Sequence, residues 1–282
     1  MKNVLRTLIY NGQVSLTVAD TTALVQEGIR LHGLTKTSAL VFGKALSTMT
    51  FMSAALKGET GEVSLSVKTE GRGGEIAVSG NSKLYMRGYI TDPCVPDTET
   101  EESCFGKIGS LTVIRDDGYS RPFVGSCALP GDGDVDSAFE EYYHISEQLP
   151  TRIRTAVETD ENGNCVFAGV IVMQMLPFAD AATFEKVGNA CMEDILNEIR
   201  DKGVESAARD NFPVDETVWE EREAIYKCNC SKEYLTEVLT SLGEAQMRQI
   251  IREDGAVRVH CHYCNTDYEF TDEDADRMFP RA

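Results

Sequence analysis

Cys228-Asn-Cys230 is followed, after 30 intervening residues, by Cys261-His-Tyr-Cys264 near the end of the 282-residue chain. Two closely spaced thiol pairs joined by a loop of this length can supply all four ligands of a tetrahedral Zn²⁺ site. The second pair has the usual Cys-x-x-Cys spacing, whereas the first is one residue tighter. We therefore predict one bound Zn²⁺, held by Cys228, Cys230, Cys261 and Cys264.

A metal site with four protein ligands has no open coordination position, so we expect the zinc to be structural and regulatory rather than catalytic. Zinc holds its sulfur ligands as thiolates, the form that oxidants attack. Oxidation gives a sulfenic acid, which a neighbouring thiol resolves to a disulfide. The spacings favour Cys228–Cys230 and Cys261–Cys264 as products, and these disulfides cannot hold zinc. Oxidation and unfolding of the terminal module should then be coupled.

The composition is that of an ordinary globular protein, with 42% hydrophobic residues, 26% charged residues and a net charge of −19. This charge repels phosphate backbones, so we expect no nucleic-acid partner. The longest apolar-looking stretch, Ser38 to Leu56, contains Lys44 and several hydroxyl groups, which predicts a buried helix rather than a membrane span. Nine cysteines without a secretory signal indicate a reducing, cytoplasmic location.

Residues 1–178 are predicted to form a large mixed α+β domain. Asn11-Gly12 between two apolar segments predicts a hairpin with a two-residue turn. Two helices should follow, one ending near Gly33 and the other running from about Lys36 to Lys57 before Gly58. The other expected elements are strands at 63–67, 75–78, 84–90 and 111–114, a helix at 134–148, and a hairpin of 152–158 with 165–175.

Residues 179–227 differ in composition and are predicted to form a metastable helical linker. They contain 13 acidic and 6 basic residues, a net charge of −7. The first half carries a helical stripe of apolar residues: Phe184, Val187, Cys191, Ile195 and Ile199. The second half has few apolar anchors, mainly Phe212, Val214, Val218, Trp219 and Ile225. A segment that buries so little surface of its own should be ordered only when docked on a neighbour.

Residues 228–282 are predicted to form a small C-terminal zinc-binding domain, because they are too few for a generous core. Two short helices and a strand leading into Cys261 should connect the thiol pairs. His260 and His262 should face away from the metal, since neighbours in a strand alternate between faces. With 6 basic and 11 acidic residues, a net of −5, this module lacks a phosphate-binding surface.

The other five cysteines lack metal spacing. Cys127, Cys165 and Cys191 lie in apolar sequence and are expected in the core. Cys94 and Cys104 flank an acidic loop, where we expect exposure and leave a mutual disulfide open. Gly71-Arg-Gly73-Gly74 and Gly125-Ser126-Cys127 lack the partners of a phosphate loop or a nucleophile elbow. Without a catalytic set, we predict that the protein is not an enzyme.

The paired cysteines and several other segments of the sequence resemble the redox-regulated 33 kDa heat-shock chaperone family, whose members are cytoplasmic holdases. The paired cysteine spacing matches the family pattern, as does Cys228-Asn-Cys-Ser-Lys-Glu-Tyr-Leu. The likeness extends into the first domain through Gly43-Lys-Ala-Leu, Gly88-Tyr-Ile-Thr-Asp-Pro and Ser146-Glu-Gln-Leu-Pro-Thr151. The acidic stretch Pro96 to Ser103 departs from the family, which leaves open whether Cys94 and Cys104 join the redox response.

The resemblance implies a mechanism. The reduced, zinc-bound protein would be inactive, with the linker folded onto the first domain. Oxidation would form the two disulfides, release zinc and unfold the terminal module. The linker would then expose apolar surface that binds unfolded client proteins without ATP, and the protein would form a homodimer on activation.

Two other functions remain open from the sequence. A thiol–disulfide oxidoreductase would use Cys261 and Cys264, although the strand–Cys-x-x-Cys–helix context of thioredoxin-like enzymes is missing. A zinc-ribbon adaptor would bind one specific protein whatever its redox state.

Overall fold

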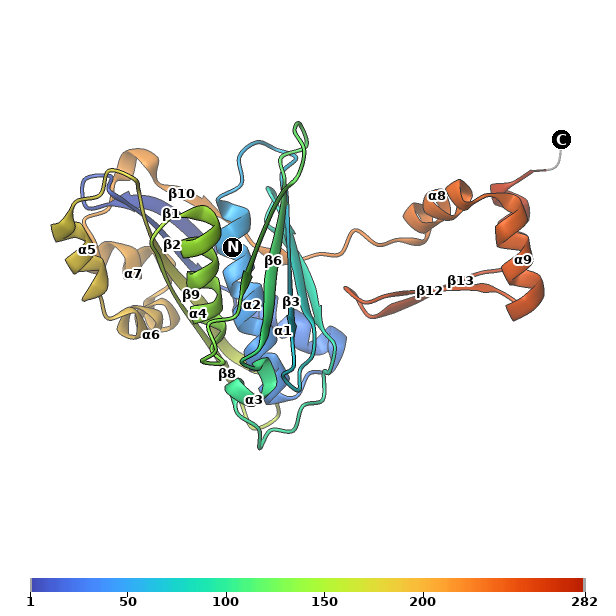
Figure 1. Cartoon of the computed structure of the whole chain (residues 1–282), viewed down its shortest axis with the longest axis horizontal. Helices are drawn as coiled ribbons and strands as arrows, with labels where there is room; N and C mark the ends of the chain where they lie inside the picture. Colours follow the sequence, from blue (N-terminus) through green and yellow to red (C-terminus); the bar gives the residue numbers. More distant parts are fainter. Residues whose placement is uncertain (1, 281–282) are drawn as a thin grey trace. The chain divides into compact units, whose positions relative to one another are not determined.

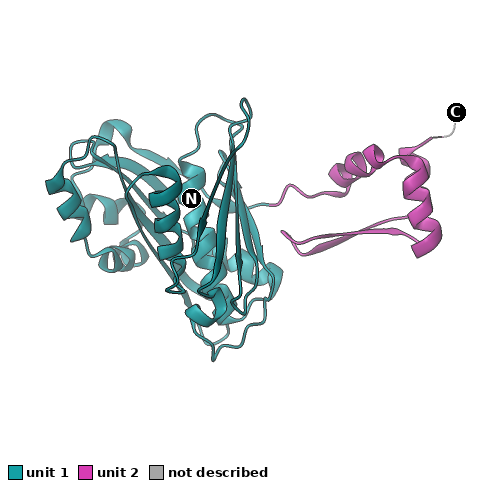
Figure 2. Ribbon diagram, in the orientation of Figure 1, with its two compact units in different colours: residues 1–227 teal, residues 228–282 magenta. Residues whose placement is uncertain are grey.

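The computed structural model describes residues 2–280, and the chain divides into two compact units, residues 1–227 and 228–282 (Figures 1 and 2). Helices and strands are mixed in both units, so the predicted α+β class is confirmed. Residues 179–227 belong to the first unit by their contacts. The proposed linker is therefore folded as part of the larger body in this state.

The first unit contains two sheets. The five-stranded sheet has the order β10-β1-β2-β9-β8. Its strands are β1 (Val4–Ile9), β2 (Val14–Asp20), β8 (Thr151–Thr159), β9 (Cys165–Met175) and β10 (Glu220–Arg222). The six-stranded sheet has the order β11-β5-β4-β3-β6-β7. Its strands are β3 (Glu62–Thr69), β4 (Ile76–Asn81), β5 (Tyr85–Ile90), β6 (Gly109–Asp116), β7 (Phe123–Ala128) and β11 (Ile225–Tyr226).

Helices α1 (Thr22–His32) and α2 (Lys36–Ala54) pack inside the first unit, with α2 between the two sheets (Figure 1). All residues of α2 except Lys36 and Leu40 are buried. Several of its hydroxyl groups form hydrogen bonds, such as that between Ser47 Oγ and Thr21 Oγ1 at 2.6 Å, whereas the buried hydroxyl of Thr48 has no such partner. Among the described residues no helix is long and apolar enough to cross a membrane.

The other face of the five-stranded sheet is covered by helices from the linker. These are α5 (Ala181–Gly188), α6 (Met192–Lys202) and α7 (Val204–Asn211) (Figure 1). They form a second apolar core with residues of β1, β2 and β9, separate from the core around α2. The sheet is therefore apolar on both faces, and the linker supplies the second cover.

The predicted linker stripe is right at three positions and wrong at two. Val187, Ile195 and Ile199 are buried, but Phe184 and Cys191 are exposed. The stripe fails at Cys191 because the chain breaks between α5 and α6, which changes the helical phase there, whereas Phe184 lies on the exposed face of α5. The helix therefore does not run continuously through the first half of the linker.

Several boundaries differ from the sequence predictions. The first hairpin has a four-residue loop rather than a two-residue turn, because Ile9 pairs with Val14 and both Tyr10 and Asn11 are left-handed. Helix α2 ends at Ala54, before Gly58. The expected helix at 134–148 divides into α4 (Val135–Tyr142) and a π-helical turn (Tyr143–Glu147). Strand β7 and helix α3 (Glu101–Phe105) were not anticipated.

The second unit has helices α8 (Lys232–Leu242), α9 (Glu244–Asp254) and α10 (Asp272–Met278) beside the hairpin of β12 (Val257–Cys261) and β13 (Thr266–Phe270). Its buried apolar core is small: Leu239, Met247, Ile251, Val257, Phe270 and Ala275. Strand β13 and helix α10 were not predicted from the sequence. So small a core supports the expectation that this unit needs a further source of stability.

A cluster of charged residues, of which Lys44 and Asp136 are buried, joins α2, α3, α4 and β8. Lys44 Nζ lies 2.7 Å from Glu101, 3.8 Å from Asp134 and 4.0 Å from Asp136. Asp136 accepts hydrogen bonds from the backbone N–H and the hydroxyl of Thr155, at 3.0 and 2.6 Å. Burial raises the pKa of Asp136 to about 6, although Lys44 and Thr155 act in the opposite direction.

This raised pKa gives a pH-dependence with a definite sign. The folded protein holds the Asp136 proton more tightly than the unfolded chain, so the contribution of Asp136 to stability falls as the pH rises from about 4 to 6. We expect the free energy of unfolding of wild type to fall relative to Asp136→Asn over this range, by roughly 2 kcal/mol. Urea unfolding of both proteins at a series of pH values measures the difference. A constant difference would contradict the assignment.

Candidate metal centre

Four short segments of the second unit position the thiols. Cys228 is the second residue after β11. Cys230 precedes Ser231, whose side chain accepts a hydrogen bond from Tyr234 N–H at the start of α8. Cys261 is the last residue of β12, and Cys264 lies in the turn before β13. Pairing of Cys261 with Thr266 closes this turn, so the hairpin register fixes the Cys-x-x-Cys loop.

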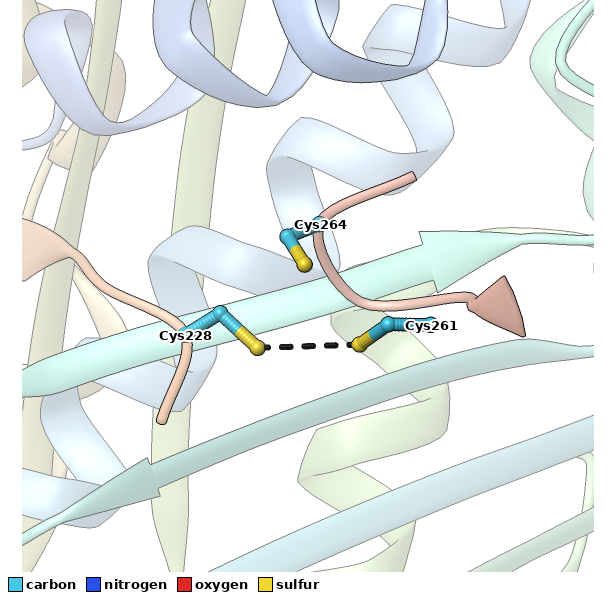
Figure 3. A group of neighbouring side chains, drawn as sticks. All are labelled: Cys228, Cys261 and Cys264. Carbon is cyan, nitrogen blue, oxygen red and sulfur yellow. Dashed lines mark hydrogen bonds between the residues drawn. The ribbon is translucent and has the colours of Figure 1, made fainter. Parts of the chain in front are cut away.

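Three of the sulfurs form a compact group. The Sγ atoms of Cys228, Cys261 and Cys264 all lie within 4.8 Å of one another, and those of Cys228 and Cys261 are 3.8 Å apart (Figure 3). Zn–S bonds of about 2.3 Å in a tetrahedron place the sulfurs about 3.8 Å apart. Cys228 thus meets Cys261 and Cys264 from 33 or more residues away in the chain, and the three thiols fit a thiolate-binding metal ion.

Cys230 is the fourth predicted ligand, and it lies outside this group of three. Its side chain hydrogen-bonds with that of Cys261, and the hydroxyl of Tyr268 donates to the Cys230 carbonyl at 3.4 Å. Cys230 thus contacts the same cluster through Cys261. Its role as a ligand stays a prediction.

The thiols differ in acidity. Burial raises the pKa of Cys228 to about 12 and also raises the pKa of Cys230. Burial acts in the same direction on Cys261, but hydrogen bonds from Cys264 and Cys230 outweigh it and lower the Cys261 pKa. Cys261 is therefore the thiol that ionises most readily of these three, and a bound cation would favour the thiolate form of all its ligands.

The neighbouring histidines have other partners. His260 Nδ1 lies 2.7 Å from Asp267 Oδ1 across the β12–β13 hairpin. The rings of His260 and His262 pack edge to face with centroids 4.9 Å apart. The expectation that both are bystanders stays a prediction, and the Asp267 contact is consistent with it for His260.

Two predictions about the burial of the remaining cysteines are wrong. Cys191 is exposed rather than in the core, because it lies at the break between α5 and α6. Cys104 is fully buried rather than exposed, because α3 turns it under Gly71 and Gly73. Cys94 is exposed, and both are free thiols. Burial raises the pKa of Cys104 to about 11, that of Cys165 to about 12, and also that of Cys127.

The comparisons with known proteins agree with this architecture. The sequence profile of a family described as Hsp33 protein matches residues 2–271. The chain belongs to the Hsp33 family. The 33 kDa chaperonin of Bacillus mycoides is 31% identical over 298 aligned residues, which span 100% of both proteins. That of Bacillus cytotoxicus is 30% identical and covers 99% of each protein.

A solved structure supports the fold. The crystal structure of the 33 kDa chaperonin (heat shock protein 33 homologue) of Thermotoga maritima matches with a TM-score of 0.81 and 24% identity. The match covers 98% of this chain and 97% of that one. The family resemblance found in the sequence is therefore confirmed. Hsp33 proteins are chaperones and not enzymes, so a chaperone role that binds client proteins follows for this chain.

Sequence reasoning missed the residues that attach the end of the linker to the sheets. Asn3 hydrogen-bonds both ways with the backbone of Ala224, at 2.8 and 3.3 Å. The Tyr226 hydroxyl donates to Gly88 O at 2.8 Å. These partners are more than a hundred residues apart, so no local pattern in the sequence could have found them.

Serine substitution tests the metal centre. We expect wild type to bind one Zn²⁺ per chain, and Cys228→Ser or Cys261→Ser to lose it at least in part, because a hydroxyl is a poor zinc ligand beside a thiolate. A chelator-based zinc assay with a chromogenic dye measures the stoichiometry and affinity. Cys230→Ser should behave like Cys261→Ser if Cys230 is the fourth ligand. Cys191→Ser, an exposed cysteine outside the cluster, is the matched control and should keep the metal.

Proposed function

We propose that this Hsp33 protein is a redox-regulated, ATP-independent holdase with three functional parts. Residues 1–178 would bind clients and dimerise, residues 179–227 would form a metastable linker, and residues 228–282 would form the redox switch. In the reduced state, Cys228, Cys230, Cys261 and Cys264 would hold one Zn²⁺ and keep the protein inactive. The protein would act in the cytoplasm and become a homodimer when active, with no nucleic-acid or membrane partner.

The observation that carries this proposal is the apolar sheet face under the linker. Residues from β1, β2 and β9 pack there against helices α5 to α7. The sheet contributes Leu5, Leu16, Val18, Phe167, Ile171 and Met173, and the linker contributes Val187, Met192, Ile195, Leu196, Ile199 and Ala207. Release of the linker would expose both surfaces to water. Contiguous apolar surface of this kind is what an unfolded protein can bind.

The linker is weak by its own composition. Helix α7 is 8 residues long, and β10 and β11 contain only 3 and 2 residues. Isolated helices shorter than about 12 residues are marginal in water. The linker is therefore ordered by its docking on the sheet and by its attachments at each end.

Its downstream attachment ends directly at the thiol cluster. The N–H of Lys227 donates to Met86 O at 2.8 Å, and the next residue is Cys228. If loss of metal unfolds the second unit, Cys228 no longer holds the end of β11 in a fixed position. This change would favour fraying of β11 and then of the linker helices.

The redox chemistry uses two thiolates for each peroxide. One thiolate attacks the peroxide to give a sulfenic acid and hydroxide, and the second thiol then displaces water to form the disulfide. Each disulfide removes two electrons from the protein and reduces one peroxide to two waters. Cys228–Cys230 and Cys261–Cys264 are the pairs favoured by spacing. In the reduced arrangement the sulfurs of Cys228 and Cys261 are also close together. Peptide mapping of the oxidised protein would therefore test which thiols form the disulfides.

Zinc would supply the second unit with stability that its small core lacks. Structural zinc sites in small peptides contribute about 10–16 kcal/mol of apparent binding free energy. The donor set fits this role, because soft thiolates select Zn²⁺ over harder cations. The Cys-x-x-Cys pair lies at a β-hairpin turn rather than between a strand and a helix, which argues against the oxidoreductase alternative.

Oxidation of the full chain tests the switch. We expect peroxide with mild heat, or hypochlorous acid, to release one zinc per chain and to suppress aggregation of a thermally unfolding client protein. Trp219, the one tryptophan, stacks against Arg209 in the linker and should change its fluorescence as the linker is released. Light scattering measures the client. If the oxidised, zinc-free protein leaves aggregation unchanged, the holdase proposal is wrong.

Linker packing can be tested without an oxidant. Ile199→Asp places a charge against the sheet at a position that is 1% exposed, so we expect linker release and client binding in the reduced, zinc-bound state. Asn197→Asp adds the same carboxylate to the same helix at an exposed position and is the matched control. Equal activity of the two reduced variants would show that the covered face is not what restrains the chaperone.

A further inference from the structure

Residues 220–227, which we term the edge strap, close one edge of each sheet in the first unit. Within the described chain, β10 is the terminal strand beside β1, and β11 is the terminal strand beside β5. The strap thus passes from the five-stranded sheet to the six-stranded sheet within a few residues. One short segment therefore pairs with backbone groups at the edges of two separate sheets.

At the β1 edge the strap pairs antiparallel, with Leu5 opposite Glu221. The N–H of Asn3 donates to Arg222 O at 3.0 Å. Lys2 Nζ lies 2.9 Å from a carboxylate oxygen of Glu221, and Glu220 interacts electrostatically with Arg6. This edge is therefore flanked by basic side chains that the strap partners with carboxylates.

At the β5 edge the strap pairs parallel, and its amides are the donors. The N–H of Ile225 donates to Leu84 O at 3.0 Å, and that of Lys227 donates to Met86 O at 2.8 Å. Beyond the last strap pair, the Tyr226 hydroxyl donates to Gly88 O at 2.8 Å and accepts from Gly88 N–H at 3.2 Å. This phenol satisfies the backbone groups that a longer strand would have paired.

Removal of the strap would leave polar backbone groups unpaired along β1 and β5. Both strands are six residues long and carry buried apolar side chains, whereas the strap pairs with only part of each. A long edge with free N–H and C=O groups is a template for another extended chain. Of the strap residues, only Ala224 is buried, so the strap is held mainly by hydrogen bonds and charged contacts at the surface rather than by a buried apolar face.

We propose that the β1 and β5 edges, once the strap has left, bind clients by β-strand addition. The occupant is an extended segment of an unfolded protein, of neutral or acidic charge, which takes the place and the backbone hydrogen bonds of the strap. The strap itself defines this chemistry, because it is an extended segment whose carboxylates face Lys2 and Arg6. This inference rests on the proposed function, which supplies the mechanism by which the strap is released in the cell.

The first test frees the β5 edge without oxidation. Ile225→Pro removes the N–H that donates to Leu84 O, whereas Ile225→Ala shortens the same side chain and keeps that donor. The probe is a fluorescent peptide of strap sequence, residues 218–227, added to each reduced full-length variant. We expect Ile225→Pro to bind it at least about tenfold more tightly than Ile225→Ala or wild type, from two recovered hydrogen bonds. Equal binding by the two variants would overturn the proposal.

The second test asks whether binding depends on the backbone N–H groups of the probe peptide. N-methylation of the probe at Ile225 and Lys227 removes the two donors to β5, whereas N-methylation at Tyr226 alters an amide that faces the opposite side of the strand. On the Ile225→Pro protein, the first peptide should lose binding and the second should retain it. The unmodified peptide should also displace a chemically unfolded client protein. Equal binding of both methylated peptides, or no displacement, would contradict the proposal.

Two further measurements distinguish this inference from the proposed redox switch and from exchange of the strap between two copies of the protein. If oxidation of wild type leaves Trp219 fluorescence unchanged while reduced Ile225→Pro binds the probe, the redox switch fails and the edge site stands. Sedimentation measures the mass of the Ile225→Pro protein. A dimer that excludes the peptide would mean that the edges take the strap of a second copy, and the client assignment would be wrong.

Discussion

A five-stranded sheet with two apolar faces needs a layer on each side, and this requirement governs the first unit. Helices α1 and α2 provide one layer from within the compact domain, and the linker helices α5 to α7 provide the other. The two layers differ in kind. Helix α2 is long and buried on nearly every side, whereas the linker helices are short, acidic and exposed on their outer face. The sheet therefore has one cover from the long helices of the domain and one from the short helices of residues 181–211.

The end of the second cover is attached by polar contacts as well as by the packing of Ala224 and Tyr226 against the core around α2. Asn3, Tyr226 and the backbone of β5 hold the chain by directed hydrogen bonds just before the first thiol. Hydrogen bonds of this kind contribute about 1 kcal/mol each and depend on the geometry of their partners. A disturbance that begins at Cys228 therefore meets a series of small, separable contacts rather than one large barrier.

The sequence predicted this arrangement where the signal was local. The cysteine spacing pointed to the thiols of which Cys228, Cys261 and Cys264 lie together, and hydrophobic periodicity placed most strands of the first unit. Composition marked residues 179–227 as a segment that must dock. It could not show the docking surface, because the partners of Ile195 and Ile199 are sheet residues far away in the chain. Cys191 and Cys104 were misplaced for a related reason: a break between helices and a short helix in an acidic loop changed which side chains face inward.

The buried thiols of the first unit have a consequence for the lifetime of the protein. Cys104, Cys127 and Cys165 are shielded from solvent, and the pKa of each is raised, so they remain protonated and react slowly with electrophilic oxygen species. Within the first unit, oxidants would therefore reach the exposed thiols of Cys94 and Cys191 before the buried ones. A molecule built in this way could pass through repeated episodes of stress and recovery with the sulfurs of its interior chemically unchanged.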